Sequence, residues 1–390
     1  MLGIKNAKIY TMAGPVIENG SILIEDGKIK EIGENIDFED DIEIIDAGGH
    51  MVTPGLVDPH SHLGIGEEGI GWEGEDYNEM SDPVTPHMRA IDGIHPHDKG
   101  FLSARQGGVT SVVTGPGSAN AIGGTFVAMK TYGDRVDDMV IKNPVAMKAA
   151  FGENIKRVYG KEQSKAPVTR MGIAALIREA LFKAKDYMEK KESGENPAFD
   201  MKSEALIPVL KKEIPLKAHA HRADDIFTAI RIAKEFDLKM TLDHATEGHL
   251  IADYIAEEGY DCICGPLMSN ASKYELKNRS YVGPGVLHSK GVKVAIMTDN
   301  SVIPTPELPL NAGRAMRSGL PEEEALKAIT INAAEITGIG DRVGSLEEGK
   351  DADIVIWSMN PIKDVECEAL YTIIDGEVVY DSERDEKFGF

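Results

Sequence analysis

Cysteine is scarce in this chain, and its scarcity excludes two classes of small protein. The 390 residues contain only three cysteines, Cys262, Cys264 and Cys367, an odd number with no CxxC pair. A disulfide-stapled secreted scaffold and a zinc ribbon are therefore both excluded. We expect a reducing, cytoplasmic location, with Cys262 and Cys264 as small buried side chains of a strand.

Long apolar runs and an excess of positive charge are also absent. No stretch approaches the 18 apolar residues of a membrane-spanning helix, and the first residues lack the apolar core of a signal peptide. The chain has 42 Lys and Arg against 65 Asp and Glu, a net charge of −23. Because phosphates and anionic lipids repel such a chain, neither nucleic acid nor a membrane is an expected partner.

Both ends of the chain carry the pattern of short β-hairpins. Asp26-Gly27 and Asp375-Gly376 each separate two runs of alternating apolar residues, which is a strong signal for a hairpin turn. Isolated hairpins are only marginally stable in water, so we expect the two ends to pack into one small β-sandwich. Residues 1–52 and 345–390 are assigned to this composite domain.

The middle of the chain alternates apolar runs with helical patterns. Helical periodicity is clear around residues 176–188 and 226–236, and Pro321 followed by three glutamates marks the start of a late helix. Eight apolar runs separated by such segments predict an α/β fold, a (β/α)8 TIM barrel of residues 53–344. The runs are Met51–Val57, Val109–Thr114, Phe126–Met129, Pro144–Ala150, Ile214–Ala218, Leu238–Leu242, Tyr260–Cys264 and Val292–Met297.

Histidines and carboxylates directly follow five of these runs. His60 and His62 follow the first run, and they point together because residues i and i+2 of a strand face the same side. The carboxyl ends of parallel barrel strands meet at one mouth, so the whole set is expected to form a metal site there. The other members are Glu153, the pair His219 and His221, His244, and Asp299.

With these features the chain resembles the amidohydrolase superfamily of metal-dependent hydrolases. The resemblance rests on the segments Val52–His62 and Gly344–Val355 and on the same order of ligands. It implies a (β/α)8 barrel and a small β-sandwich built from both chain ends. Within the superfamily the chain is most similar to imidazolonepropionase-related amidohydrolases, through Pro116–Asn120 with Ile122–Gly124, Phe151–Asn154 and His219–Asp225.

The resemblance implies a centre of two divalent metal ions. Carried over by position, His60 and His62 bind the more buried ion together with Asp299, and His219 and His244 bind the second ion. Zinc is the default metal for a histidine-rich site, and iron or manganese would fit the same ligands.

Two ligand positions stay open. The bridging position is assigned to Glu153, which lies past the end of its strand, with a carbamylated Lys148 as the alternative. His219 and His221 share one face of a strand, so either can be the metal ligand. The other one, His221 in our assignment, would contact the substrate.

The ligand set implies a reaction. The metal ions lower the pKa of bound water, the hydroxide attacks a carbonyl carbon, and Asp299 passes the proton to the leaving nitrogen. The bond broken is then the C–N bond of a cyclic or linear amide. Arg157, Tyr159 and Arg170, which follow the fourth run, are candidates for binding a substrate carboxylate.

Other functions fit the same fold. The alternatives are a deaminase of an aminated ring, a prolidase-like dipeptidase, and a non-catalytic structural homologue, against which the filled ligand positions argue. The expected partner is a small-molecule amide, and the expected assembly is a homo-oligomer. The fold alone does not name the substrate.

Overall fold

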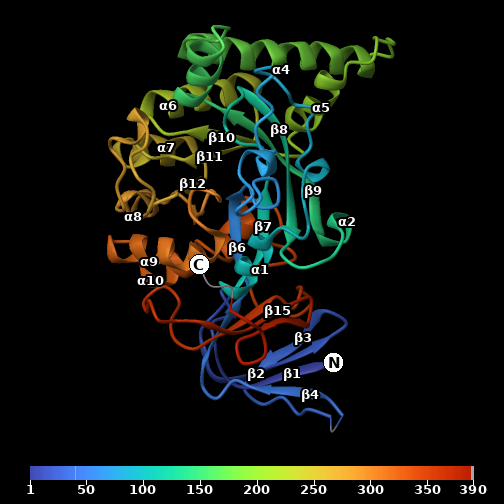
Figure 1. Cartoon of the computed structure of the whole chain (residues 1–390), viewed down its shortest axis with the longest axis vertical. Coiled ribbons are helices and arrows are strands. Elements are labelled where there is room, and N and C mark those ends of the chain that lie inside the picture. The colour runs from blue at the N-terminus through green and yellow to red at the C-terminus, as the bar shows by residue number, and fades with distance from the viewer. Residues whose placement is uncertain (40, 388–390) are drawn as a thin grey trace.

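The computed structural model describes residues 1–39 and 41–387, which form a barrel and a smaller sheet below it (Figure 1). In Figure 1 the blue N-terminal and red C-terminal strands lie together in the smaller sheet, so both chain ends build one unit. The predicted composite domain is thus present as a unit, and its boundaries at residues 52 and 345 stay a prediction. Residue 40 and residues 388–390 of that domain lie outside the described residues.

The smaller sheet has the order β16-β15-β14-β5-β1-β2-β3, and β4 pairs with β1. The N-terminal and C-terminal segments of the chain meet where β5 pairs with β14. The pairing is antiparallel and places Pro54 opposite Ile354. Both predicted hairpins are confirmed, because Asp26-Gly27 and Asp375-Gly376 have positive φ at both turn positions, as a type I′ turn requires. The strands are β1 Leu2–Ile9, β2 Ile17–Glu25, β3 Lys28–Gly33, β4 Glu43–Asp46, β5 Met51–Pro54, β14 Ile354–Trp357, β15 Ala369–Ile374 and β16 Glu377–Asp381.

The barrel sheet runs in chain order from β6 to β13, and each of the eight predicted runs contributes a strand. Its two edge strands meet, because the backbone N–H of Asp299 donates to His60 O at 3.2 Å and that of His62 donates to Asn300 O at 2.9 Å. The strands are β6 Leu56–Ser61, β7 Val109–Thr114, β8 Ile122–Lys130, β9 Val140–Ala150, β10 Leu216–Ala220, β11 Met240–His244, β12 Cys262–Cys264 and β13 Val294–Ile296.

One barrel strand departs from the strict β/α alternation. β8 is antiparallel to both β7 and β9, while every other barrel pairing is parallel. Only residues 115–121 separate β7 from β8, too few for the crossover of a dozen or more residues that parallel strands need. The loop before α1 packs along β8 instead, and Thr85 N donates to Ile122 O at 2.8 Å.

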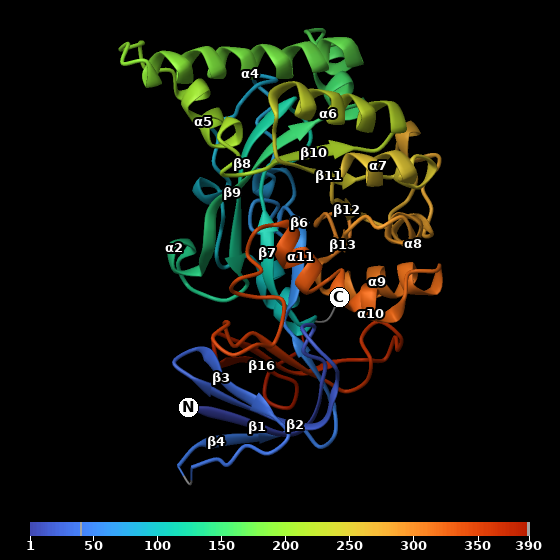
Figure 2. The ribbon, with the colours of Figure 1, turned by 180° about the vertical axis from the view of Figure 1, so that it is seen from behind.

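Helices cover the outside of the barrel, and their apolar faces form a buried core with the strands. Figures 1 and 2 show α7, α8, α9 and α10 along one side, and α4, α5 and α6 at the far end from the smaller sheet. The predicted helices appear as α4, α6 and α10, with Pro321 capping the last. The helices are α1 Lys99–Gln106, α2 Val136–Met139, α3 Glu153–Ile155, α4 Arg170–Glu192, α5 Met201–Leu210, α6 Ala223–Phe236, α7 Ala252–Glu258, α8 Gly283–Ser289, α9 Leu308–Arg317, α10 Glu322–Lys327 and α11 Ile331–Ile336.

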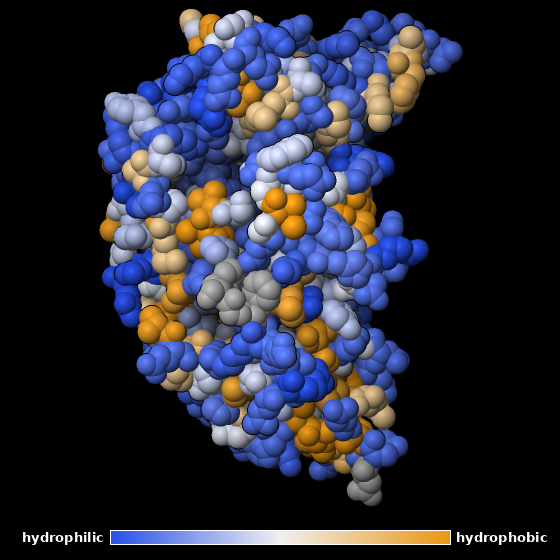
Figure 3. All heavy atoms as spheres, in the orientation of Figure 1, coloured by the Kyte–Doolittle hydropathy of each residue, from blue (hydrophilic) through white to orange (hydrophobic). Residues whose placement is uncertain are grey.

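The surface agrees with the strongly acidic composition. The face in Figure 3 is mostly hydrophilic, and its apolar side chains gather in small groups. Within residues 1–39 and 41–387, no helix combines the length and apolar character needed to cross a membrane.

Candidate metal centre

The first group of metal-binding side chains joins the two edge strands of the barrel. His60 lies on β6, His62 follows it, and Asp299 follows β13. Their ligand atoms all lie within 4.8 Å of one another. Asp299 Oδ1 is 3.3 Å from His62 Nε2 and 3.7 Å from His60 Nε2. The predicted trio is therefore brought together.

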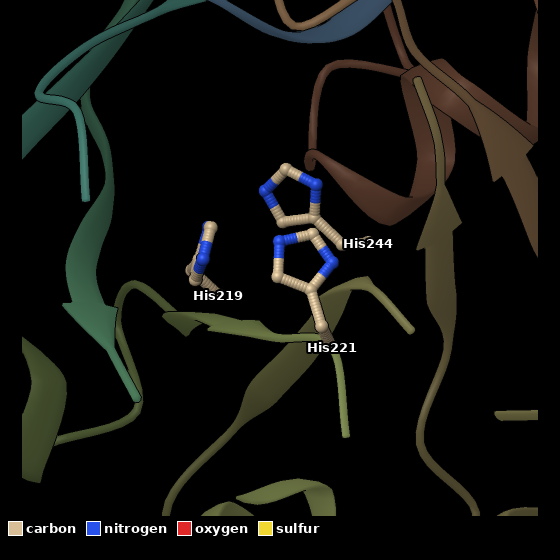
Figure 4. A group of neighbouring side chains, drawn as sticks. All are labelled: His219, His221 and His244. Carbon is tan, nitrogen blue, oxygen red and sulfur yellow. The ribbon is translucent and has the colours of Figure 1, made fainter. Parts of the chain in front are cut away.

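The second group consists of three buried histidines from two neighbouring barrel strands, β10 and β11. His219 lies on β10, His221 follows that strand, and His244 ends β11. Figure 4 shows the three rings gathered around one point, with ring centroids 4.2–4.7 Å apart. The rings of His60 and His244 are 5.5 Å apart, so the two groups are neighbours.

Hydrogen bonds fix the orientation of these imidazoles. His62 Nδ1 is 2.6 Å from Gly115 O, and His244 Nδ1 is 2.8 Å from Gly265 O. Because a carbonyl oxygen only accepts, each Nδ1 carries the proton and each Nε2 keeps its lone pair. His60 Nδ1 likewise bonds to the Asp243 carboxylate. This arrangement of a ligating imidazole backed by a carbonyl or carboxylate is typical of metal sites.

The second group has a deficit of hydrogen bonds that a cation would remove. Both ring nitrogens of His219 and the Nε2 atoms of His221 and His244 are buried without a partner among the described residues. An unsatisfied buried polar atom costs about 1–3 kcal/mol. Burial also lowers the pKa of His219 and His221 far below the ordinary value and that of His244 to about 4. These histidines are thus neutral at pH 7, the form that binds a metal.

Two lysines and an aspartate lie inside the barrel beneath the first group. Lys148 Nζ, on β9, is 3.1 Å from His60 Nε2, and burial lowers the pKa of this amine to about 8. Lys217 Nζ is 2.8 Å from Asp243 Oδ2. Burial opposes ionisation of Asp243, yet Lys217 and His60 outweigh it and keep the pKa of the carboxyl well below its usual range. Asp243 and Lys217 were not predicted as site residues.

The two candidates for the bridging position have different surroundings. Lys148 Nζ contacts His60 of the first group, and its positive charge lowers the pKa of histidines in both groups. Glu153 lines the same cavity, but its Oε2 accepts from the backbone N–H of Glu275 at 3.2 Å, and it belongs to neither group. The structure therefore brings Lys148, and not Glu153, into contact with a predicted ligand.

The predicted carboxylate-binding residues have different surroundings. Arg157 lines the cavity and forms an ion pair with Glu162 at 2.8 Å. Tyr159 is buried, and its hydroxyl donates to Asn120. Arg170 forms an ion pair with Asp225 at 2.9 Å. Tyr159 and Arg170 are not among the cavity-lining residues. After β9 the chain forms a π-helical segment, Lys156–Glu162, that packs Tyr159 into the core.

A cavity of about 600 Å³ adjoins both groups. Five of the six grouped residues line it, together with residues from two loops, and these loop residues were not among the predicted site residues. Tyr77, from the loop before α1, stacks on His62 with ring centroids 5.2 Å apart. Lys273 and Arg279 come from the loop between β12 and α8. The volume suits a small organic molecule.

A barrel with histidine and aspartate groups at its strand ends is the architecture expected of a metal-dependent hydrolase. The amidohydrolase family matches residues 51–379, and the chain belongs to this family. Members of the family usually bind metal ions, which agrees with the two groups of ligands. The resemblance inferred from the sequence is thereby confirmed.

Three similar proteins illustrate the relationship. Amidohydrolase tasK of Hapsidospora irregularis is 30% identical over 93% of this chain, which spans only 40% of that relative. An imidazolonepropionase of Brevibacillus brevis is 28% identical, covering 88% of this chain and 85% of its own. The crystal structure of an amidohydrolase from Thermotoga maritima is 43% identical, with a TM-score of 0.94 and coverage of 98% of this chain and 100% of its own.

Proposed function

We propose that this chain is a metal-dependent amidohydrolase that hydrolyses the C–N bond of a cyclic or linear amide. The proposal rests on buried imidazole nitrogens that have no hydrogen-bond partner among the described residues and that converge beside a carboxylate at one rim of the barrel. The similarity to an imidazolonepropionase and to other amidohydrolases supports the same class of bond.

Two zinc ions are the proposed cofactors, with iron or manganese as the substitutes that these ligands would also accept. His60, His62 and Asp299 would hold one ion, and His219 and His244 the other. His221 lies within the second group, where it would complete the ligand set or contact the substrate. For the bridging position we propose a carbamylated Lys148 in place of Glu153, because only its terminal atom reaches His60.

Bound divalent cations lower the pKa of water and polarise a carbonyl oxygen. Asp299 would move the proton in this chemistry. Burial opposes its ionisation, but the neighbouring His244, His62 and His60 keep the pKa of its carboxyl below the usual range, so it is ionised at neutral pH. It would accept a proton from the attacking water and deliver it to the leaving nitrogen.

The metal content of the purified chain tests the proposal. Two equivalents of a divalent metal are expected, and His60→Asn and His219→Asn should each lose about one equivalent. His249→Gln is the matched control, because His249 is nearby but belongs to neither group and bonds to Thr246 O. A parent chain that retains no metal after expression in metal-supplemented medium would contradict the proposal.

The reaction class is tested separately on the metal-loaded chain. A panel of N-acyl amino acids, dipeptides, hydantoins and imidazolones should contain a substrate whose C–N bond is cleaved, detected by mass spectrometry of the products. Aminated rings belong in the same panel, since ammonia released from them alone would make the chain a deaminase.

A further inference from the structure

The loop between β12 and α8, residues 265–282, forms one wall of the cavity. It contributes Pro266, Ser269, Ser272, Lys273, Leu276 and Arg279 to the lining. Its base is held in place, because Glu275 is buried, accepts from the backbone N–H of Glu153 at 2.9 Å, and lies 2.8 Å from Lys273 Nζ. The loop therefore presents its side chains from a fixed position across from the strand ends.

The cations that line this cavity differ in their partners. Arg157 is neutralised by Glu162, and Lys273 is neutralised by Glu275 and also donates to Asn154 Oδ1 at 3.2 Å. The guanidinium of Arg279 donates only to Ser269 Oγ, at 3.2 Å, and forms no ion pair with a carboxylate in the described part of the chain. Arg279 is thus the lining cation whose charge has no acidic counterpart.

A shortage of acidic residues does not explain why Arg279 has no carboxylate partner in the described part of the chain. The chain has 23 more acidic than basic residues, so acceptors for an arginine are abundant elsewhere on it. A half-buried guanidinium with free N–H groups beside a small-molecule cavity is suited to an anion that arrives with the ligand. Guanidinium and carboxylate form two parallel hydrogen bonds, which fix the orientation of the bound molecule as well as its charge.

We propose that Arg279 is the specificity-determining residue of this site and binds a carboxylate of the substrate, so that the preferred substrates are small amides bearing a carboxylate. This inference rests on the proposed amide hydrolysis. It replaces Tyr159 and Arg170 as carboxylate-binding residues, because both have internal partners and neither lines the cavity. Arg279 acts in recognition, and the bond-breaking chemistry belongs to the residues at the strand ends.

Matched substrate pairs test the proposal. Each carboxylate substrate found in the panel is compared with its primary amide, which has the same shape and no charge. The Arg279→Gln variant should lose roughly 30-fold or more in kcat/KM on the carboxylate and less than about 3-fold on the amide. Arg279→Lys should recover part of the loss, since it restores charge without the two-pronged geometry.

Arg231→Gln is the control for removal of a surface positive charge, because Arg231 is exposed on α6 and outside the cavity. It should leave both members of each pair unchanged. Equal losses of Arg279→Gln on the carboxylate and the amide would overturn the proposal and assign Arg279 a structural role. No loss on either would also overturn it.

A second measurement needs no turnover and no variant. Phenylglyoxal modifies accessible guanidinium groups, and peptide mass spectrometry reports the modified fraction of Arg279, with Arg231 as an internal reference. Carboxylate members of the panel should protect Arg279, and their amides should not. If the chain hydrolyses no amide but protection is seen, the proposed function fails and the anion site stands. If no carboxylate protects Arg279, the anion site is wrong.

Discussion

Lys148 Nζ, on β9, lies 3.1 Å from His60 Nε2, on β6. A charged lysine amine cannot stay beside a metal ion that is bound by His60, because the positive charges of the amine and the ion repel each other. We therefore propose that Lys148 is carbamylated in the metal-loaded chain, because a carbamate would replace the positive charge with oxygens that are suited to bind metal ions. Two variants separate this reading from a bridge by Glu153.

Lys148→Met should lose about one of two metal equivalents and reduce turnover by roughly 10²-fold, a loss typical of disturbed metal sites. Glu153→Gln should keep both equivalents, because the carboxylate of Glu153 accepts from a backbone N–H and lies outside both groups. Elemental analysis of the two purified variants makes the comparison. The opposite pattern would assign the bridge to Glu153.

Asp299→Asn should keep most of the bound metal and lose turnover by roughly 10²–10⁴-fold. The amide oxygen of the variant still offers a ligand atom, but it cannot take up a proton at neutral pH. Metal content and kcat are measured on the same preparation. Turnover at the parent rate would show that Asp299 does not transfer the proton.

The metal-free chain should become less stable as the pH falls from about 6.5 to about 4. Burial lowers the pKa of His244 to about 4, so in this range the unfolded chain binds a proton that the folded chain does not. The protonation of His244 accounts for roughly 3 kcal/mol of the decrease in the free energy of unfolding, since one pKa unit corresponds to about 1.4 kcal/mol. The contribution of His244 to the free energy of unfolding is fully present above pH 6.5 and is lost as the pH falls toward the pKa of His244 in the folded chain, about 4.

His244→Gln isolates this contribution. Burial raises the pKa of Asp58 to about 7, which acts in the opposite direction over the same range, so the parent must be compared with the variant. Urea unfolding of both metal-free chains at pH 4 and pH 7 should show a smaller acid-induced loss for His244→Gln. Identical losses would mean that the pKa of His244 is the same in the folded and unfolded chains.

Gly108 sits where the barrel meets the smaller sheet, and its replacement should be costly. Its φ is +73°, and a Cβ atom at this position would collide with the Trp357 ring. Gly108→Ala is therefore expected to lower the free energy of unfolding by roughly 2–4 kcal/mol, from backbone strain and overpacking together. Denaturant titration measures the loss.

Gly291→Ala is the matched comparison. Gly291 also has a positive φ, +85°, but no atom of the described residues lies within 4 Å of a Cβ added there. Gly291→Ala should therefore lower the free energy of unfolding by about 1 kcal/mol, from backbone strain alone. Equal losses at the two positions would show that the contact with Trp357 contributes nothing.

Local sequence patterns were enough to predict the features that are set by residues close together in the chain, such as turns and strand ends. The two Asp-Gly turns follow from the backbone freedom of those residues, and the grouping of His60, His62 and Asp299 follows from strand polarity. The direction of β8 was missed because the apolar pattern of a strand is the same in either direction. The length of residues 115–121 was the available signal.

Residues in mid-strand or on long loops were harder to assign. Lys148 was set aside in favour of Glu153 because it lies within its strand, yet its side chain is long enough to reach the strand ends. Lys217 precedes His219 by two positions and therefore faces the same side, which was a usable signal. No sequence pattern indicated a binding role for Arg279, since only the folded chain shows which cations have acidic partners.

The register that sets Pro54 opposite Ile354 has a consequence for synthesis on the ribosome. The β5 edge emerges 300 residues before the strand that covers it. Until the last segment is translated, that edge exposes unpaired backbone groups next to apolar side chains, the kind of edge that recruits another chain. Products truncated between residues 300 and 353 are therefore expected to aggregate even though they contain every proposed metal ligand, because the strand that covers the β5 edge is missing from them.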